Sequence, residues 1–366
     1  MAPPSRIYSL DYLRGITALA IMFFHLTSWT FGKYNAEDLM GRIGLYGVSV
    51  FYILSGLTLS LIYAESLKPT KQSLLTFGIK RTFRIYPLLW LTVGLTLYLS
   101  PKLYNSTDFF LSITGLFGFV KPAAGFGTGV WSIGNELVFY TTFPILILVA
   151  QFSRPLFLIL SAILVRISLY FAFFIFEANL PIAKQWAWYV NPLNQMVLFV
   201  GGMLLGFAAL QFPDKKPAVW LTVVIIIAAW LLFIFYPASG DRITLVMGWN
   251  RLIFLALSFL ICGGVYFLNY RLPGMLHKSL TLTAEISFGL YLLHPVVYFF
   301  LLKHFKEQLK GLDQTILVLM VAVLAYLVSY LAFRFVEMPV VNLGKNYTDK
   351  LKIGASTKKH REKPFI

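Results

Sequence analysis

The chain has 366 residues, of which 58% are hydrophobic and 13% are charged. Soluble domains are about 45–50% apolar and about 25% charged, so the composition excludes an ordinary soluble protein and indicates a polytopic membrane protein. The formal net charge of +16 would suggest a nucleic-acid partner in a soluble protein. In a membrane protein it reflects the basic residues that gather in cytoplasmic loops.

Apolar runs follow one another along almost the whole chain, at lengths close to the roughly 20 residues that span a bilayer core. An additional run at 109–120 has only 12 residues, which suits a short re-entrant or interfacial segment. We therefore predict an all-α polytopic membrane helical bundle of about ten transmembrane helices. The expected spans are 8–31, 43–64, 84–100, 130–151, 156–176, 193–211, 217–236, 249–268, 281–302 and 314–335.

Basic residues predict the orientation of these spans. With ten spans and the N-terminus inside, the inner segments hold eighteen Lys and Arg residues and the outer loops hold nine. If 109–120 also crossed, the distribution would invert. The positive-inside rule therefore favours ten spans with both termini cytoplasmic. Residues 1–340 are then the membrane domain, and 341–366 are a basic, flexible cytoplasmic tail.

The first span carries three ionisable residues. Successive helical residues turn by about 100° and rise about 1.5 Å, so Arg14 and His25 share one face about 16 Å apart, with Asp11 on the same stripe as Ala18 and Met22. Ionisable residues in a membrane usually face a wet cavity or the protein interior. Two simpler interpretations stay open, an Asp11–Arg14 ion pair and a histidine that is only hydrogen-bonded core.

The second span is rich in small residues, Gly44, Gly47, Ser49, Ser55 and Gly56. Small residues let membrane helices approach closely, so helix packing is the leading interpretation. Close approach of the backbone to an extended substrate chain is the alternative. Ser55 is less suited to act as a nucleophile, because no base stands at a suitable spacing.

Lys80, Arg81 and Arg84 stand where a cytoplasmic loop enters the third span. Arg81 and Arg84 are three residues apart and can face one site. Arginine holds phosphate through bidentate, charge-assisted hydrogen bonds. A cluster that only obeys the positive-inside rule explains the same residues equally well.

Glu136 lies inside a predicted span, near its outer end, and an intramembrane glutamate is by default a candidate functional residue. It can orient His25 and stabilise its cation, with Asn135 and Trp131 lining the same cavity. The alternative is a protonated carboxyl that is hydrogen-bonded between helices.

The last spans carry further polar residues. Tyr291 and His294 share a face of the ninth span. They are expected either to line the cavity or to anchor the helix, and both roles stay open. Pro339 is expected to end the last helix just after Glu337. The remaining histidines, His277, His304 and His360, are expected at the surface. The single cysteine, Cys262, excludes an internal disulfide, and metal-ligand spacing is absent, so no metal is expected.

Six motifs together resemble the membrane-bound acyltransferase 3 family. They are "LDYLRG" with Arg14 and His25, "FYILSG" (51–56), "KRTFRIYP" (80–87), "WSIGNELVFY" (131–140), "ISFGLYLLHP" (286–295) and "FVEMP" (335–339). The resemblance implies about ten spans in the bacterial cytoplasmic membrane. It also implies transfer of an acyl group, usually acetyl from acetyl-CoA, onto hydroxyls of cell-surface glycans and some small molecules. In this family pattern Arg81 and Arg84 grip the phosphates of CoA.

The resemblance implies an acetyl-CoA-dependent O-acyltransferase. His25 serves either as general base or as an acyl-imidazole, Arg14 braces it or contacts the donor, and Glu136 assists. The donor is acyl-CoA, acetyl or succinyl, held by Arg81 and Arg84 with Lys80. The acceptor is a glycan or lipid-linked sugar. Membrane lipid is a further expected partner, and no nucleic-acid partner is expected. The predicted cavity residues are Asp11, Ser55, Trp131, Asn135, Tyr291 and His294.

Two rival functions stay open at this point. A transporter or flippase of a lipid-linked sugar also needs intramembrane charges and a central cavity, but it does not require the pairing of Arg14 and His25 with Arg81 and Arg84. Acylation of a small metabolite uses the same chemistry with another acceptor, and nothing in the sequence identifies the acceptor.

Overall fold

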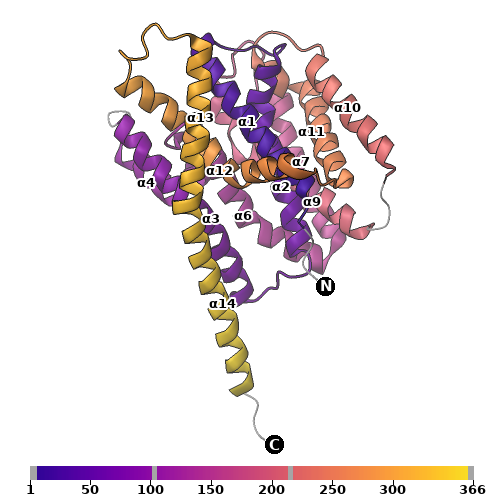
Figure 1. The fold of residues 1–366 in the computed structure, drawn as a ribbon. Coiled ribbons are helices and arrows are strands. Elements are labelled where there is room, and N and C mark those ends of the chain that lie inside the picture. Colours follow the sequence, from indigo (N-terminus) through magenta and orange to yellow (C-terminus); the bar gives the residue numbers. More distant parts are fainter. Residues whose placement is uncertain (1–5, 101–104, 213–216, 362–366) are drawn as a thin grey trace, which may run out of the picture.

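A computed structural model describes residues 6–100, 105–212 and 217–361, with backbone alone for 352–361. The chain is 81% helical, and the described residues form no strand (Figure 1). This confirms the predicted all-α bundle. The main helices are α1 Tyr8–Phe31, α2 Leu39–Tyr63, α3 Lys71–Leu99, α6 Val130–Phe152, α7 Arg154–Tyr170, α9 Pro192–Gln211, α10 Val219–Phe235, α11 Gly248–Leu268, α12 Gly274–His304, α13 Gln314–Ala332 and α14 Met338–Arg361.

A main helix occupies each of the ten ranges expected to span the membrane. Within the described chain, eight helical stretches are long and apolar enough to cross a membrane. α10 falls short of that length with 17 residues, and α1 is made more polar by Asp11, Arg14 and His25. The polytopic bundle is thus confirmed, while the count of ten spans stays a prediction.

Several helix starts follow directly from side chains that satisfy the free N–H groups of a first turn. Thr70 accepts from the N–H of Ser73 at the start of α3, and Ser153 accepts from Leu156 at the start of α7. Asp313 accepts from two N–H groups at the start of α13. These caps fix the helix boundaries locally, whereas burial of the apolar faces fixes how the helices pack.

The segment 109–120 does not form a spanning helix. It folds as two short helices, α4 Ser106–Thr114 and α5 Phe117–Val120, separated by Gly115, whose φ of +73° favours glycine. The hydroxyl of Tyr86 and the indole N–H of Trp90 donate to the carbonyls of Thr114 and Ile113. The segment is therefore held against α3, as expected of a short segment that does not cross.

The small residues of the second span pack against neighbouring helices. A Cβ on Gly56 would lie 2.0 Å from the carbonyl oxygen of Phe199 in α9, and Gly202 of α9 approaches the Ile53 carbonyl in the same way. Gly44 and Gly47 make room for Phe24 and Ile21 of α1. Close helix packing is therefore what these glycines provide.

The C-terminal region departs from expectation, because Pro339 does not end the last helix. A π-helical turn, Phe333–Glu337, connects α13 to α14, which continues to Arg361 and projects beyond the bundle (Figure 1). Pro339 is the second residue of α14, a position in the first turn where a missing N–H is tolerated. The tail expected at 341–366 is helical as far as residue 361, and residues 362–366 lie outside the described part.

The start of α3 and the tail helix lie side by side. The Gln72 side-chain amide donates to the carbonyl of Leu351 at 3.0 Å, and Gly344 of α14 packs against the Phe83 ring. The segment 65–84 and the tail therefore share one end of the bundle, whichever side of a membrane that end faces.

Candidate functional site

The bundle contains two neighbouring cavities, of about 350 Å³ and about 720 Å³. Arg14, Arg81 and Arg84 line the smaller one, which we name the arginine cavity. His25 lines the larger one, the histidine cavity. Val48 and Tyr291 line both, so the two cavities meet at these side chains.

The arginine cavity is formed between α1, α2, α3, α6 and α12. Its ionisable lining residues from these helices are Asp11, Arg14, Arg81, Arg84 and Glu136. The ion pairs formed within the described residues include none to its three arginines from α1 and α3. Asp11 pairs with Arg6, which also lines the cavity. Three guanidinium groups are then left facing one carboxyl group, that of Glu136, and the cavity suits an anionic ligand.

The Arg81 guanidinium is held by aromatic rings and keeps a hydrogen-bond donor without a partner. Its guanidinium lies over the rings of Phe77 and Tyr140, with Cζ 5.7 Å and 5.5 Å from the ring centroids. Its buried Nε has no hydrogen-bond partner. Aromatic faces orient a guanidinium without using its N–H donors, so these donors stay available to a phosphate.

Arg84 lies one turn further along α3 and lines the same cavity, as the spacing predicts. Its side chain is exposed. Lys80 is half-buried and does not line either cavity. The structure therefore brings Arg81 and Arg84 together with Arg14, but leaves out Lys80.

Glu136 lies with the arginines and is not the partner of His25. It lines the arginine cavity, and the charges that act on it most strongly are those of Arg84, Arg14 and Arg81. The expected orientation of His25 by this carboxyl is therefore wrong, because α6 presents Glu136 to the charged ends of α1 and α3. Its role is to partly balance three like charges.

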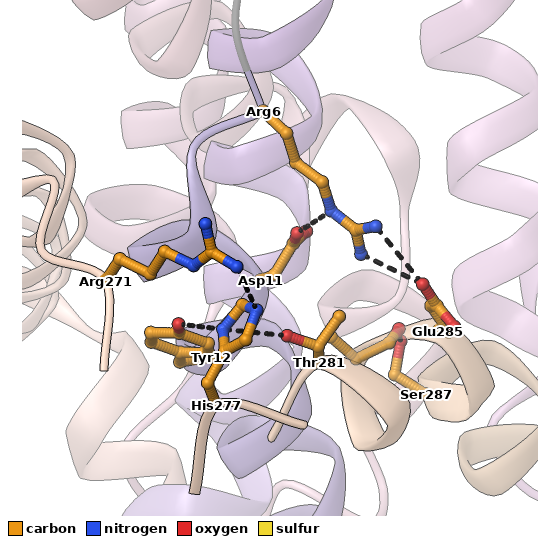
Figure 2. Close-up of polar contacts among 9 residues, drawn as sticks. Arg6, Asp11, Tyr12, Arg271, His277, Thr281, Glu285 and Ser287 are labelled. Atoms are coloured by element: carbon orange, nitrogen blue, oxygen red, sulfur yellow. Dashed lines mark hydrogen bonds and ion pairs between the residues drawn. The ribbon is translucent and has the colours of Figure 1, made fainter. Parts of the chain in front are cut away.

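At the rim of the arginine cavity, α1 is tied to α12 by ionic contacts (Figure 2). Arg6 pairs with Asp11 at 2.6 Å and with Glu285 at 3.2 Å. Asp11 thus pairs with Arg6, and the Asp11–Arg14 ion pair, which the sequence left open as an alternative, is not among those of the described residues.

A second polar cluster lies beside this rim (Figure 2). His277 belongs to the first turn of α12 and is half-buried, so the expected surface position is wrong. Its Nδ1 lies 2.6 Å from the Tyr12 hydroxyl, and its Nε2 lies 3.4 Å from an Arg271 nitrogen. These contacts attach the start of α12 to α1.

The histidine cavity combines aromatic and polar lining. Trp29, Trp131 and Trp186 line it together with His25. Arg242, from the turn after α10, adds a positive charge, and the residues described along this cavity include no carboxylate. Its volume falls in the usual range of small-molecule sites, roughly 300–1,000 Å³.

The partner of His25 is His294. Nδ1 of His25 lies 3.0 Å from Nε2 of His294, and the two rings are inclined by 22°. Trp29, four residues after His25, stacks on it with ring centroids 5.1 Å apart. His294 itself is buried and lines neither cavity, so the expected cavity-lining role is wrong and its contact is with the catalytic candidate.

Tyr291 forms the boundary between the cavities. Its hydroxyl donates to the Gly129 carbonyl at 3.1 Å. Gly129 has a φ of +85°, and a Cβ there would lie 3.0 Å from the Tyr291 ring. Glycine is therefore required at 129 both for its backbone conformation and for the position of the tyrosine.

The other expected cavity residues divide between the two cavities and the core. Ser55 lines the arginine cavity, and its Oγ donates to the Tyr140 hydroxyl at 3.3 Å. Asn135 is buried behind the cavities and donates to the Tyr52 hydroxyl at 3.1 Å. The stripe on α1 is also interrupted, because Ala18 and Met22 pack into a core cluster that includes residues of α12 and α13.

Three further residues, Arg242, Trp29 and Tyr140, line the cavities and were not predicted from the sequence. Helical spacing would have found Trp29 and Tyr140, which stand four residues after His25 and Glu136 on the same helices. Arg242 lies in a turn, where no period places its side chain. Among the described residues, no three His, Cys, Asp or Glu side chains group in a way that could hold a metal ion.

Comparison with known proteins supplies independent findings. A family model described as "Acyltransferase domain" matches residues 7–334. Over 161 residues the chain is 31% identical to the acyltransferase MdmB of Streptomyces mycarofaciens, in an alignment that covers 38% of this chain and 39% of that protein. The match thus spans well under half of either protein. No solved structure matches.

Proposed function

Because the chain belongs to the acyltransferase 3 family, we propose that it is an integral-membrane O-acyltransferase that uses acyl-CoA, with acetyl as the group transferred. The acceptor is a hydroxyl of a glycan or lipid-linked sugar. One observation carries the proposal: the cavity that Arg14, Arg81 and Arg84 line meets the cavity that His25 lines at Tyr291. This arrangement suits an anionic donor on one side and a hydroxyl acceptor on the other.

The donor binds in the arginine cavity. Arg81 and Arg84 hold the phosphates of CoA, because their guanidinium groups have no carboxylate partner among the described ion pairs and match phosphate geometry. Arg14, on the cavity wall formed by α1, adds a third positive charge. The acyl-pantetheine arm then extends past Tyr291 toward His25.

The acceptor binds in the histidine cavity. Its tryptophan side chains offer apolar faces, and Arg242 offers a charged donor for an anionic group of the acceptor. The cavity is large enough for a terminal sugar or a small metabolite. We prefer the glycan or lipid-linked sugar because the cavity lies in a membrane protein.

The chemistry needs a base, since a hydroxyl is a poor nucleophile near pH 7. In the direct route, His25 takes the hydroxyl proton as the oxygen attacks the thioester carbonyl, the C–S bond breaks and a C–O bond forms. The proton then leaves with the CoA thiolate. In the stepwise route, His25 attacks the thioester carbonyl, the C–S bond breaks, and CoA thiolate leaves an acyl-imidazole behind. The hydroxyl then attacks the acyl carbon, the C–N bond breaks as the C–O bond forms, and the hydroxyl proton ends on the CoA thiolate.

We place the protein in the bacterial cytoplasmic membrane with both termini cytoplasmic. The distribution of Lys and Arg supports this orientation, and it puts the basic start of α3 on the side where acyl-CoA is made. The transfer path would then run outward from the arginine cavity to His25.

The test uses the purified protein in nanodiscs with [14C]acetyl-CoA and a glycolipid extract of the host membrane as acceptor. We expect label in the glycolipid and release of CoA thiol from the wild type, and neither from His25→Ala, which should still bind CoA. The protein's own Cys262 is fully buried, so it adds little to the signal measured for the released CoA thiol. Transfer by His25→Ala at the wild-type rate would refute the mechanism.

Omitting the acceptor separates the two routes. In a single turnover with [14C]acetyl-CoA alone, the stepwise route leaves label on the protein at His25. The direct route leaves the protein unlabelled and the donor intact.

A further inference from the structure

We propose that His294 is a positioning residue, which fixes the His25 proton on Nδ1 and so leaves the Nε2 lone pair of His25 free to react. The inference rests on the proposed function, because it assigns how His25 is prepared for that chemistry. It starts from the 3.0 Å contact between Nδ1 of His25 and Nε2 of His294.

The protonation of His294 follows from its backbone contacts. Its Nδ1 lies 2.8 Å from the carbonyl oxygen of Leu290, and the carbonyl of Tyr291 is a second acceptor for the ring. A carbonyl oxygen can only accept a hydrogen bond. The Nδ1 of His294 must therefore carry its proton, and in the neutral ring Nε2 is the acceptor.

The next residue leaves one of these two carbonyls, that of Tyr291, without its helical donor. Pro295 lies inside α12 and has no N–H, so the carbonyl of Tyr291, four residues earlier, lacks its usual helical donor. The buried His294 ring supplies an N–H to this region. Pro295 thus leaves one further acceptor beside the ring, in addition to the Leu290 carbonyl that Nδ1 contacts.

A hydrogen bond between the two ring nitrogens needs a proton on one of them, and Nε2 of His294 does not carry one. His25 must therefore donate from Nδ1, and the remaining lone pair of its ring is on Nε2. The opposite arrangement requires a His294 cation that is 1% exposed. Arg242 is the charged side chain whose field reaches His25, and its positive sign makes an added buried cation still more costly.

Two further features keep the pair in this state. Trp29 stacks on His25 at an angle of 16°, which opposes rotation of the ring. The proton on Nδ1 of His294 faces carbonyl oxygens that cannot take it, so His294 holds His25 without relaying its proton. When His25 accepts a proton on Nε2, the same Nδ1–H···N bond stabilises the imidazolium, which is how an orienting partner assists a general base.

The test compares two substitutions that both introduce a side-chain amide, but at different distances from the backbone. In His294→Gln the side-chain oxygen can occupy the place of Nε2 and accept from His25, whereas in His294→Asn it reaches only the place of Nδ1. His294→Leu keeps bulk without an acceptor. We expect His294→Gln to retain most of kcat, and the other two to lose about a hundredfold or more, the usual share of a general base.

The KM for acetyl-CoA and the affinity for CoA should stay unchanged in all three variants, because His294 does not line the arginine cavity. Equal activity of the Gln and Asn variants would overturn the inference, as would an inactive Gln variant that still binds CoA. If the wild type transfers no acyl group, the proposed function fails, and if His25→Ala transfers acyl groups normally, the assignment of His25 as the reacting residue fails. If His25→Ala is inactive while all three His294 variants are active, only the positioning role fails.

Discussion

At the residue scale, the feature that most needs a ligand is Arg81. A buried guanidinium nitrogen without a partner is costly, and Arg81 Nε has none. Its neighbours Phe77 and Tyr140 orient the group through their rings and do not compete for its donors. A protein retains such a group where a bound anion completes its hydrogen bonds.

This leads to a prediction for donor binding. Arg81→Gln and Arg84→Gln should each weaken CoA binding by about ten- to a hundredfold, since a charge-assisted hydrogen bond contributes about 1.5–3 kcal/mol. Isothermal titration calorimetry of CoA into the purified variants measures this. Lys80→Gln is the matched control, because it removes a neighbouring charge outside the cavity.

The control decides between two explanations. If Lys80→Gln weakens CoA binding as much as the arginine variants do, general surface charge is responsible. If none of the three changes affinity, the cluster serves only membrane topology.

Salt dependence gives a further prediction at this scale. The arginine cavity draws CoA phosphates through charge, so raising the ionic strength from about 0.05 M to about 0.5 M should weaken CoA binding in the wild type, as screening shortens the range of charge interactions. The double variant Arg81→Gln/Arg84→Gln should show a clearly smaller salt dependence. Equal dependence in both proteins would mean that the two arginines do not contact the phosphates.

At the element scale, glycines on α2 set how closely it approaches α1 and α9. Gly56 and Gly202 bring the backbones of α2 and α9 together at two points. This close packing positions the helix that carries Ser55 and Tyr52 into the arginine cavity. Helix packing in a membrane depends on such contacts because lipid offers little hydrophobic driving force.

The prediction for this element is a loss of stability in Gly56→Ala. The added Cβ would meet the Phe199 carbonyl at 2.0 Å, and overpacking of this kind costs about 1–3 kcal/mol. Gly78→Ala in α3 is the control, because its Cβ meets nothing within 4 Å. The melting temperature in detergent should fall for Gly56→Ala and stay or rise slightly for Gly78→Ala. An unchanged melting temperature for Gly56→Ala would show that α2 and α9 can separate without cost.

At the scale of the whole molecule, the contact between Gln72 and Leu351 puts the start of α3 and the tail helix at one end. The proposed orientation makes that end cytoplasmic and puts α4 at the opposite face. Orientation decides the direction of acyl transfer, because acyl-CoA must reach Arg81 and Arg84 from the side where it is made.

Single-cysteine labelling tests this orientation in a Cys262→Ala background. Cysteines at the exposed positions Lys71, Asn346 and Thr107 should react with a membrane-impermeant maleimide. In intact cells Thr107→Cys alone should be labelled, and the other two only after lysis. Labelling of Lys71→Cys and Asn346→Cys from opposite faces would contradict the fold, and labelling of both from outside would reverse the transfer path.

The sequence by itself determined the helical bundle and most of its helix ranges. Long apolar runs have few alternatives in a membrane, because every backbone hydrogen bond must be satisfied within the segment. Helical spacing also placed Arg81 and Arg84 on one cavity wall. The same local logic failed at Pro339, since a π-helical turn lets the proline begin a new helix where sequence rules end one.

Only the tertiary structure decided which polar residues meet. Glu136 and His25 both looked suited to one site, yet α6 presents Glu136 to the arginines, and His25 is held by His294, 269 residues away along the chain. Arg42 shows the same limit. It is 2% exposed and donates to backbone carbonyls at the end of α10, among them those of Phe233 and Tyr236. Periodicity fixes which face of a helix a side chain occupies, but the rotation and depth of each helix, which select its partner, come from the packing of the whole bundle.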